Sequence, residues 1–389
     1  MSLFLWGILG VLLATIWMVR LLEAARGLRR IADVTQPQWE QTVASAPRVS
    51  IIVAARNEEQ ALEPALESLL TLDYPNYEIV AVNDRSTDAT PEILERMHAT
   101  VGPRLRVIHI SSLPPGWLGK SHAMCRGSWQ ATGDWLLFTD ADVLFRPDCL
   151  RRVMVFAHRT SADHVVLFPT MLMKTWGERM MAAFLQCLFV LSWGHTPWKV
   201  HDPRARDYLG AGAFNLLRRS ALEAVGGMAS LRMEVVEDLK LGKLVKQHGL
   251  AQRVVFGQDL ITIHWARGAL GMVRNLTKNF FALMNYRWSL ALAAIAGLLL
   301  LNLAPFVGAL LAPGWSRLGY AIAVAAIAAM YIGMARYSRI SPRYFFLHPV
   351  SSCLMAYSIL RSAVLTGWRG GVVWRGTKYP LEELRRGTV

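Results

Sequence analysis

An apolar segment runs straight into two acidic residues in the stretch Gly133-Asp134-Trp135-Leu136-Leu137-Phe138-Thr139-Asp140-Ala141-Asp142. The apolar run predicts a buried β-strand, and the spacing of Asp140 and Asp142 puts both carboxylates on one face. Two carboxylates held together repel each other unless a proton or a cation lies between them. A hard divalent cation, which takes oxygen ligands and usually also binds substrate phosphates, would resolve this conflict. The alternative is a plain turn after a strand, since Asp is a common turn residue.

The segments before this stretch alternate between strand and helix patterns. Short apolar runs at residues 48–55, 77–82 and 106–110 predict buried parallel strands. Between them, apolar residues at helical spacing predict a helix through Leu72 and another from Glu92. The sequence therefore predicts an α/β domain with a mainly parallel sheet.

Polar residues stand where three of these strands end. Asn57, Asp84 and the pair Asp140 and Asp142 each follow an apolar run. In parallel α/β sheets, ligands bind beyond the carboxyl ends of the strands. We therefore expect these residues to form one site.

A loop lysine and an acidic pair are further candidates. Lys120 follows a rigid Pro-Pro-Gly turn, and the proline at position 114 excludes a Walker phosphate-binding loop. We interpret Lys120 as an anion contact, with a solvated loop lysine as the alternative. Glu237 and Asp238 precede a helical pattern, so they either complement the dipole of that helix or include a general base.

Four stretches are apolar enough to enter a membrane. Three are long enough to span it, whereas the fourth carries His348 and Arg361, which leaves spanning, re-entrant and interfacial placements open. A further segment, 182–200, is too interrupted to span and predicts either an interfacial helix or a buried domain helix. The four stretches are Ser2–Val19, Ser289–Ala312, Leu318–Met334 and Phe345–Gly367.

The 389 residues carry a formal net charge of +14, which raises the question of nucleic acid binding. Much of the excess flanks the apolar segments or lies in the C-terminal tail, where attraction to anionic lipid headgroups accounts for it. We therefore predict no nucleic acid partner. Arginines directly after the first apolar segment predict an outside N-terminus and a cytoplasmic domain. Four full spans would place the tail outside, but its positive charges favour the inside.

Jointly, these motifs resemble the membrane-bound family 2 glycosyltransferases, whose nucleotide-sugar domain has the GT-A fold. The segment Leu113-Pro114-Pro115-Gly116-Trp117-Leu118-Gly119-Lys120 is similar to a bacterial subgroup near hopanoid-associated, ceramide and carotenoid glycosyltransferases, which implies the bacterial inner membrane. The other pieces that carry the resemblance are Val49–Glu59, Val82–Asp88, Gly119–Ala123, Thr139–Asp142 and Glu234–Asp238.

The resemblance also implies roles for the candidate residues. Asp140 and Asp142 would hold Mg²⁺ or Mn²⁺ bridging the diphosphate of a nucleotide sugar, with Asp142 the more direct ligand. Asp238, with Glu237 beside it, would deprotonate the acceptor hydroxyl, and attack from the opposite face would invert the anomeric centre. Asp84 would contact the uracil or its ribose, and Lys120 would lie near the nucleotide. The other residues expected to bind the donor are Asn57 and Glu58, together with Asp140.

The chain departs from the family pattern at one place. Processive synthases carry a Gln/Arg-x-x-Arg-Trp motif, whereas Met284 stands at the first position of the corresponding Met284–Trp288 stretch. We therefore expect transfer of one sugar, from a UDP-sugar, to a membrane lipid or polyisoprenoid-type acceptor. A processive exopolysaccharide synthase and a catalytically silent scaffold subunit are the alternatives.

These features divide the chain into five regions. They are an N-terminal transmembrane anchor (1–20), a basic connector (21–47), a GT-A glycosyltransferase domain (48–285), a C-terminal transmembrane region (286–367) and a basic tail (368–389).

Overall fold

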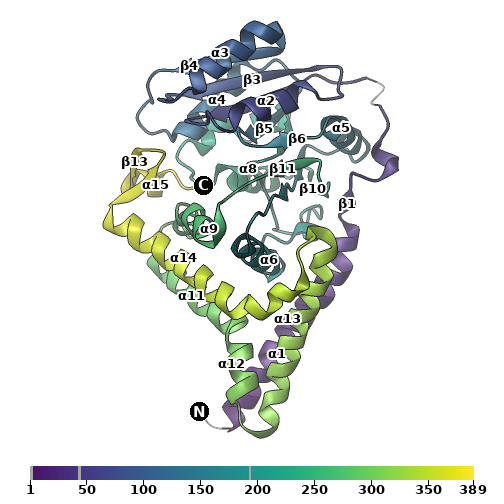
Figure 1. Cartoon of the computed structure of the whole chain (residues 1–389), viewed down its shortest axis with the longest axis vertical. Coiled ribbons are helices and arrows are strands. Elements are labelled where there is room, and N and C mark those ends of the chain that lie inside the picture. The colour runs from purple at the N-terminus through teal and green to yellow at the C-terminus, as the bar shows by residue number, and fades with distance from the viewer. Residues whose placement is uncertain (1–2, 43–44, 192–193) are drawn as a thin grey trace. The chain divides into compact units, whose positions relative to one another are not determined.

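The computed structural model describes residues 3–42, 45–191 and 194–389 and divides the chain into two compact units (Figure 1). Unit 1 comprises Met1–Arg30, Met173–Thr196 and Trp265–Trp374, and unit 2 comprises Ile31–Leu172, Pro197–His264 and Arg375–Val389. Residues 1–2 of the predicted anchor, 43–44 of the connector and 192–193 of the segment 182–200 lie outside the described residues.

Unit 2 is built on one large, mainly parallel sheet. Among the described residues, eight strands pair in the order β1-β10-β7-β9-β5-β2-β3-β4. Only β9 runs antiparallel, against β5 and β7, within this part of the chain. The predicted α/β class with a mainly parallel sheet is therefore confirmed.

The central strands are buried on both faces, which is why they read as continuous apolar runs. Every residue of β3 is buried, and β2 is buried except at one position. On one face, side chains of β2, β3 and β5 pack with those of α4 and α8 in a single apolar cluster. The sheet therefore holds its strand ends rigidly, and the polar loops begin there.

The strands of unit 2 are β1 (Ala32–Asp33), β2 (Val49–Ala55), β3 (Tyr77–Asp84), β4 (Leu105–Ile110), β5 (Trp135–Asp140), β6 (Leu144–Phe145), β7 (His164–Leu167), β8 (Thr170–Met171), β9 (Asn215–Arg218), β10 (Gln252–Phe256), β11 (Ile261–Ile263) and β13 (Thr377–Pro380). Its helices are α2 (Leu62–Leu70), α3 (Thr90–Val101), α4 (Gly119–Gln130), α5 (Cys149–Arg159), α7 (Arg219–Ala224), α8 (Glu237–Gln247) and α15 (Leu381–Arg386).

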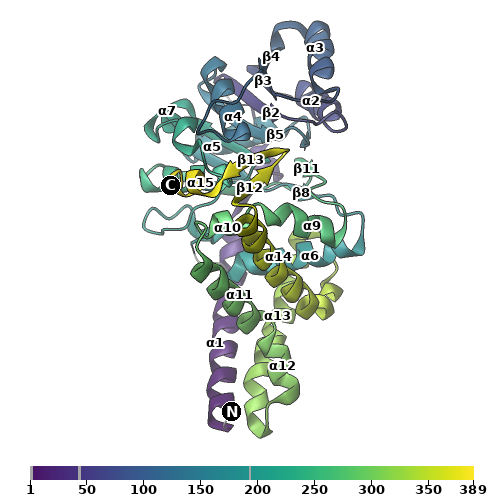
Figure 2. The same ribbon diagram turned by 90° about the vertical axis from the view of Figure 1, so that its left-hand side faces the viewer.

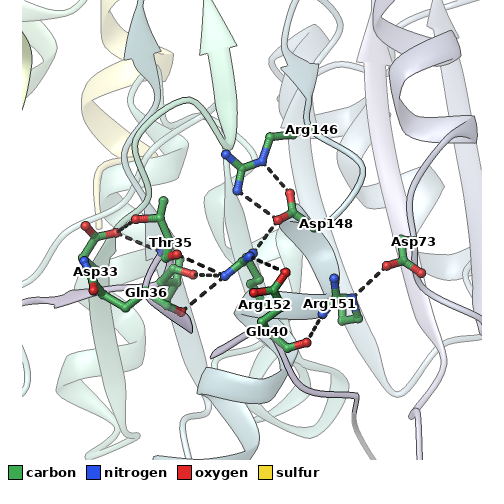
Figure 3. A network of polar contacts seen from close by, with 10 residues as sticks. Asp33, Thr35, Gln36, Glu40, Asp73, Arg146, Asp148, Arg151 and Arg152 are labelled. Carbon is green, nitrogen blue, oxygen red and sulfur yellow. Dashed lines mark hydrogen bonds and ion pairs between the residues drawn. The ribbon is translucent and has the colours of Figure 1, made fainter. Parts of the chain in front are cut away.

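A polar network fastens the chain before β2 to helix α5 (Figure 3). The guanidinium of Arg152 donates to the carbonyl oxygens of Thr35 (3.2 Å) and Gln36 (3.3 Å) and to the carboxylate of Asp148. Arg146 donates to the same carboxylate, at 2.5 and 2.9 Å. Burial alone raises the pKa of Asp148, but these hydrogen bonds lower it to about 2. The ionised carboxylate of Asp148 thus holds Arg152, one of the arginines of α5 that bind the connector.

Unit 1 contains the apolar helices. Helix α1 packs along α13, and α12 also packs against α13, which follows it in the chain (Figures 1 and 2). Glycine permits the close crossing of α1 and α13, since a Cβ on Gly319 would lie 2.5 Å from the carbonyl carbon of Gly10. Helix α14 packs against α6, α9 and α11.

Three helical segments among the described residues are long and apolar enough to cross a membrane: Leu3–Arg30, Gly314–Ser338 and Pro342–Trp368. The stretch predicted at 289–312 is instead a pair of helices, α11 and α12, that bend by 45° at a short break. Pro305 lies in the first turn of α12, where proline cannot continue the hydrogen bonding of α11.

The elements of unit 1 are α1 (Leu3–Gly27), α6 (Trp176–Leu191), α9 (Gly268–Thr277), α10 (Phe280–Leu283), α11 (Trp288–Asn302), α12 (Ala304–Leu311), α13 (Arg317–Ser338), α14 (His348–Trp368) and β12 (Gly371–Trp374). Helix α6 includes residues 182–191 of the segment 182–200 and is grouped with the apolar helices, whereas Pro197–Lys199 form a short 3-10 helix grouped with unit 2.

Candidate active site

The ends of β2, β3 and β5 carry the predicted site residues to one edge of the sheet. These strands are parallel neighbours, with Ala54 paired to Asp140 and Ala55 paired to Asn83. Asn57, Asp84 and Asp142 therefore follow strand ends that lie side by side.

Asp84 is buried and already bound by arginine. Its oxygens accept from Arg85 at 2.7 and 3.0 Å, and Arg56 Nη1 lies 3.7 Å from Oδ2. The pKa of Arg85 is raised, mainly because its guanidinium donates a hydrogen bond to Asp84. Gly119 opens α4 directly beside this group, since a Cβ there would lie 2.3 Å from Asp84 Oδ2. The lack of a side chain at Gly119 therefore lets α4 begin against this ion pair. The sequence prediction missed both arginines.

Asn57 links two loops of the site. It adopts a left-handed conformation (φ 54°), which Asn tolerates better than most residues. Its Oδ1 accepts from the backbone of Thr87 at 2.8 Å, and its own N–H donates to Ser86 at 3.0 Å. Asn83 Oδ1 accepts from the backbone of Ser86 at 3.1 Å. These bonds give Asn57 a role in shaping the loop after β3.

Lys120 lies between two carboxylates. Its Nζ is 2.7 Å from Asp140 Oδ1 and 2.7 Å from Glu237 Oε1. Burial alone lowers the pKa of Lys120, but the carboxylates of Asp140, Glu237 and Asp238 raise it. Burial raises the pKa of Glu237, while Lys120 acts in the opposite direction. The lysine thus joins the acidic end of β5 to the start of α8, so it is no solvated loop residue.

Asp142 differs from Asp140 because no cationic side chain pairs with it among the described residues. Burial, Asp140 and Glu58 raise the pKa of Asp142 to about 7. Such a carboxylate favours a proton or a cation. Within the described residues no three His, Cys, Asp or Glu side chains gather as a metal cluster. Asp142 and Asp140 could therefore hold a hard cation whose other ligands are water and phosphate, as Mg²⁺ usually is.

Asp238 lies in the first turn of α8, and its oxygens contact backbone amides. Oδ2 accepts from Gly212 N at 2.8 Å, and Oδ1 accepts from Leu239 N at 2.8 Å. The glycine-rich loop approaches closely, because a Cβ on Gly210 would lie 1.8 Å from the Asp238 carbonyl oxygen. A Cβ on Gly212 would lie 2.7 Å from Asp140 Oδ2. The loop and α8 thus hold Asp238 near the acidic end of β5.

The segment after β12 supplies residues that the sequence prediction did not place at this edge. Arg375 donates to the carbonyl oxygen of Arg56 and to Glu58 Oε1. The hydroxyl of Tyr379 accepts from Gly119 N at 3.1 Å. Sequence order alone gave no signal for these contacts, because more than 250 residues separate the partners.

Comparison with known proteins identifies the domain. The model of the family "Glycosyl transferase family 2" matches residues 50–239, which include the strand ends described above. The matched residues belong to a family 2 glycosyltransferase domain, and all of them except 173–196 are grouped in unit 2. The predicted resemblance to family 2 glycosyltransferases is therefore confirmed for these residues.

The names of two relatives of this family 2 domain indicate glycosylation of lipids. The chain is 29% identical over 234 residues to a beta-monoglucosyldiacylglycerol synthase of Synechocystis sp., a match covering 57% of this chain and 45% of that protein. It is 24% identical to the 4,4'-diaponeurosporenoate glycosyltransferase of Staphylococcus haemolyticus, covering 59% and 60%. The chain thus spans less than two thirds of the length of these relatives.

A solved structure confirms the fold. The mannosyltransferase PcManGT from Pyrobaculum calidifontis, in complex with GDP-Man and Mn²⁺, matches 94% of this chain and 99% of its own, with a TM-score of 0.54 and 20% identity. The family 2 domain therefore has a GT-A-like fold.

Proposed function

We propose that the protein transfers a single sugar from a nucleotide sugar, a UDP-sugar, to a lipid acceptor in a membrane. The observation that carries this proposal is the meeting of Asp84, Asp140 and the half-buried Asp142 at one strand edge, and the raised pKa of Asp142 agrees with it. The named activities of the relatives on diacylglycerol and carotenoid lipids support the acceptor class. The apolar helices of unit 1 support a multi-pass membrane protein, and the arginines after α1 support a cytoplasmic sheet unit.

Asp142 and Asp140 would hold Mg²⁺ or Mn²⁺, as their chemistry and the Mn²⁺ of PcManGT suggest. When bound, this cation would compensate the charge that the leaving diphosphate gains. Lys120 and Glu237 would keep Asp140 in place.

Asp238 would act as the general base. The acceptor hydroxyl loses its proton to Asp238 as its oxygen forms a bond to the anomeric carbon. The bond from that carbon to the diphosphate oxygen breaks, and the nucleoside diphosphate leaves with the bonding electron pair. Attack opposite the leaving group inverts the anomeric centre.

The test uses membranes that contain the full chain. They are incubated with labelled UDP-glucose, UDP-galactose, UDP-N-acetylglucosamine and GDP-mannose, and the lipid extract is analysed by mass spectrometry. We expect one UDP-sugar to give a lipid bearing one sugar. Asp142→Asn should lower transfer at least about 100-fold, as loss of charge stabilisation at a reacting phosphate does. The control Asp73→Asn changes an exposed carboxylate paired with Arg151 and should leave the rate unchanged.

Two outcomes would contradict the proposal. Long glycan chains in place of a lipid with one sugar would indicate a processive synthase. Full transfer by Asp142→Asn would show that this carboxylate does not serve the reaction.

A further inference from the structure

The segment Arg375–Tyr379 lies in unit 2 and contacts the ends of two central strands. Arg375 reaches the carbonyl oxygen of Arg56 and the carboxylate of Glu58. Arg56 Nη1 in turn donates to Thr377 Oγ1 at 3.2 Å. Both partners, Arg56 and Glu58, follow β2, so the segment is fastened to the edge that carries the acidic residues.

Tyr379 anchors the other end of the segment. Its side chain is 5% exposed, and its hydroxyl accepts from Gly119 N at the start of α4. Tyr379 also forms a hydrogen bond with Arg85, the residue that holds Asp84. The segment therefore runs from Glu58 to the Asp84 ion pair, along the same edge.

The backbone of the segment is strained at Arg375. Arg375 (φ 46°) and Gly376 (φ 77°) are consecutive residues in the left-handed region. Gly376 adopts it without cost, but an arginine does so only when its surroundings enforce it. This turn directs the guanidinium back to Glu58.

The edge carries several carboxylates, so a diphosphate needs cations there. Lys120 is held between two carboxylates, and Arg85 binds both oxygens of Asp84. Their side chains are 20% and 19% exposed, whereas that of Arg375 is 42% exposed. Arg375 is thus the most exposed of these three cations at the edge where β2 and β3 end.

We propose that the segment Arg375–Tyr379 forms a wall of the nucleotide site, in which Arg375 binds the diphosphate of the donor and Tyr379 positions the Asp84 side. A guanidinium suits this role because its planar donors match phosphate oxygens. On donor binding, Arg375 exchanges the carboxylate of Glu58 for the diphosphate. This inference rests on the proposed function, since it assumes a nucleoside diphosphate donor.

The test measures the affinity of purified full-length protein in detergent for uridine, UDP and GDP by titration calorimetry with Mn²⁺ present. For Arg375→Ala we expect UDP to bind about 10- to 100-fold more weakly, as loss of a hydrogen bond to a charged group implies, with uridine unchanged. Arg375→Lys should restore part of the affinity for UDP. Tyr379→Phe should weaken uridine and UDP by the same factor, about 3- to 10-fold.

The matched control is Arg386→Ala, which removes the same charge from an exposed position of α15 and should change neither affinity. An equal loss of uridine and UDP affinity in Arg375→Ala, or no loss at all, would overturn the inference. If the wild-type protein bound neither UDP nor GDP, the proposed function would fail instead. Thermal unfolding of each variant within about 2 °C of wild type shows that the comparison is between folded proteins.

Discussion

Glu237 and Asp238 are neighbours in the chain, yet their carboxylates contact different groups. Glu237 is buried against Lys120, whereas Asp238 accepts from the backbone of Gly212. The helix start sets this division, because successive side chains in the first turn of α8 point about 100° apart. Glu237 therefore holds the lysine that fixes Asp140, and Asp238 is left for the acceptor.

Substitutions should separate the two roles. Asp238→Asn keeps an oxygen that can accept from Gly212 N but cannot take up a proton, so kcat should fall about 10²- to 10⁴-fold with UDP affinity unchanged. Glu237→Gln should keep kcat within about 10-fold and lower the melting temperature, because Lys120 loses one of its two carboxylates. Steady-state kinetics and calorimetry on both variants check this. The reverse pattern would assign the base to Glu237.

At the scale of single residues, the sequence predicted contacts in the site only between residues that are close in the chain or that follow neighbouring strands. Asp140 and Asp142 stand two apart, and their common edge with Asp84 follows from strand order. The pairing of Lys120 with both Asp140 and Glu237 could not be predicted, because it depends on how α4 and α8 pack against the sheet. The hydrogen bonds by which Asn57 holds the loop after β3 depend on backbone angles that no local sequence pattern predicts.

Among the elements, helix α5 binds the connector through several arginines, and one of them, Arg152, is held by the carboxylate of Asp148. The pKa of Asp148 in the folded protein, about 2, lies below the value of about 3.9 for an unfolded Asp. The unfolded chain therefore binds more protons between these values, so Asp148 contributes stability above pH 4 that is lost as the pH falls toward 2. This carboxylate should matter at neutral pH and cease to matter in acid.

Asp148→Asn tests this at pH 7 and at pH 3. We expect a loss of about 1 to 2 kcal/mol in unfolding free energy at pH 7, since Arg146 and Arg152 lose their common partner. The loss in unfolding free energy should be smaller at pH 3, because there the ionised carboxylate of Asp148 stabilises the wild-type protein less. Thermal unfolding in detergent gives both values. Asp73→Asn, at a side chain that is 65% exposed, should change stability little at either pH. An equal loss for both variants would contradict this account.

The elements themselves were well predicted where apolar periodicity is strong. The predicted strands before the acidic pair correspond to β2, β3, β4 and β5, with ends shifted by one or two residues. The antiparallel β9 was not predicted, because its four residues follow a loop of small residues and carry no pattern of their own. The bend between α11 and α12 was also missed, since the apolar run continues through it and hydropathy does not register a change in helix direction.

For the whole molecule, the path of the chain constrains its membrane topology. The chain leaves unit 2 at His264 and returns to it at Arg375. Both segments fold into one unit, so both lie on the same side of any membrane that the protein enters. The residues between them must therefore cross an even number of times. At least one of the three apolar segments between them, the bent pair α11–α12, α13 or α14, therefore does not cross, and the tail lies on the same side as the sheet unit.

Cysteine labelling in whole cells checks this. The background variant is Cys353→Ser, because Cys353 is exposed while Cys125, Cys149 and Cys187 are buried. Into it we place Trp129→Cys, at a side chain of the sheet unit that is 65% exposed, or Arg386→Cys in the tail. A membrane-impermeant maleimide should label both positions only after the cells are permeabilised. Labelling of one position alone in intact cells would contradict the even number of crossings.

The return of the chain at Arg375 also sets an order of events during synthesis. A ribosome makes every apolar helix of unit 1 before it makes Arg375 and Tyr379. On our proposal, a nascent chain can fold its central sheet early but cannot finish its donor site until the membrane segments have been translated. Sugar transfer from the nucleotide sugar would thus begin only in chains whose membrane helices have already been made. Those helices would hold the site next to the lipid that receives the sugar.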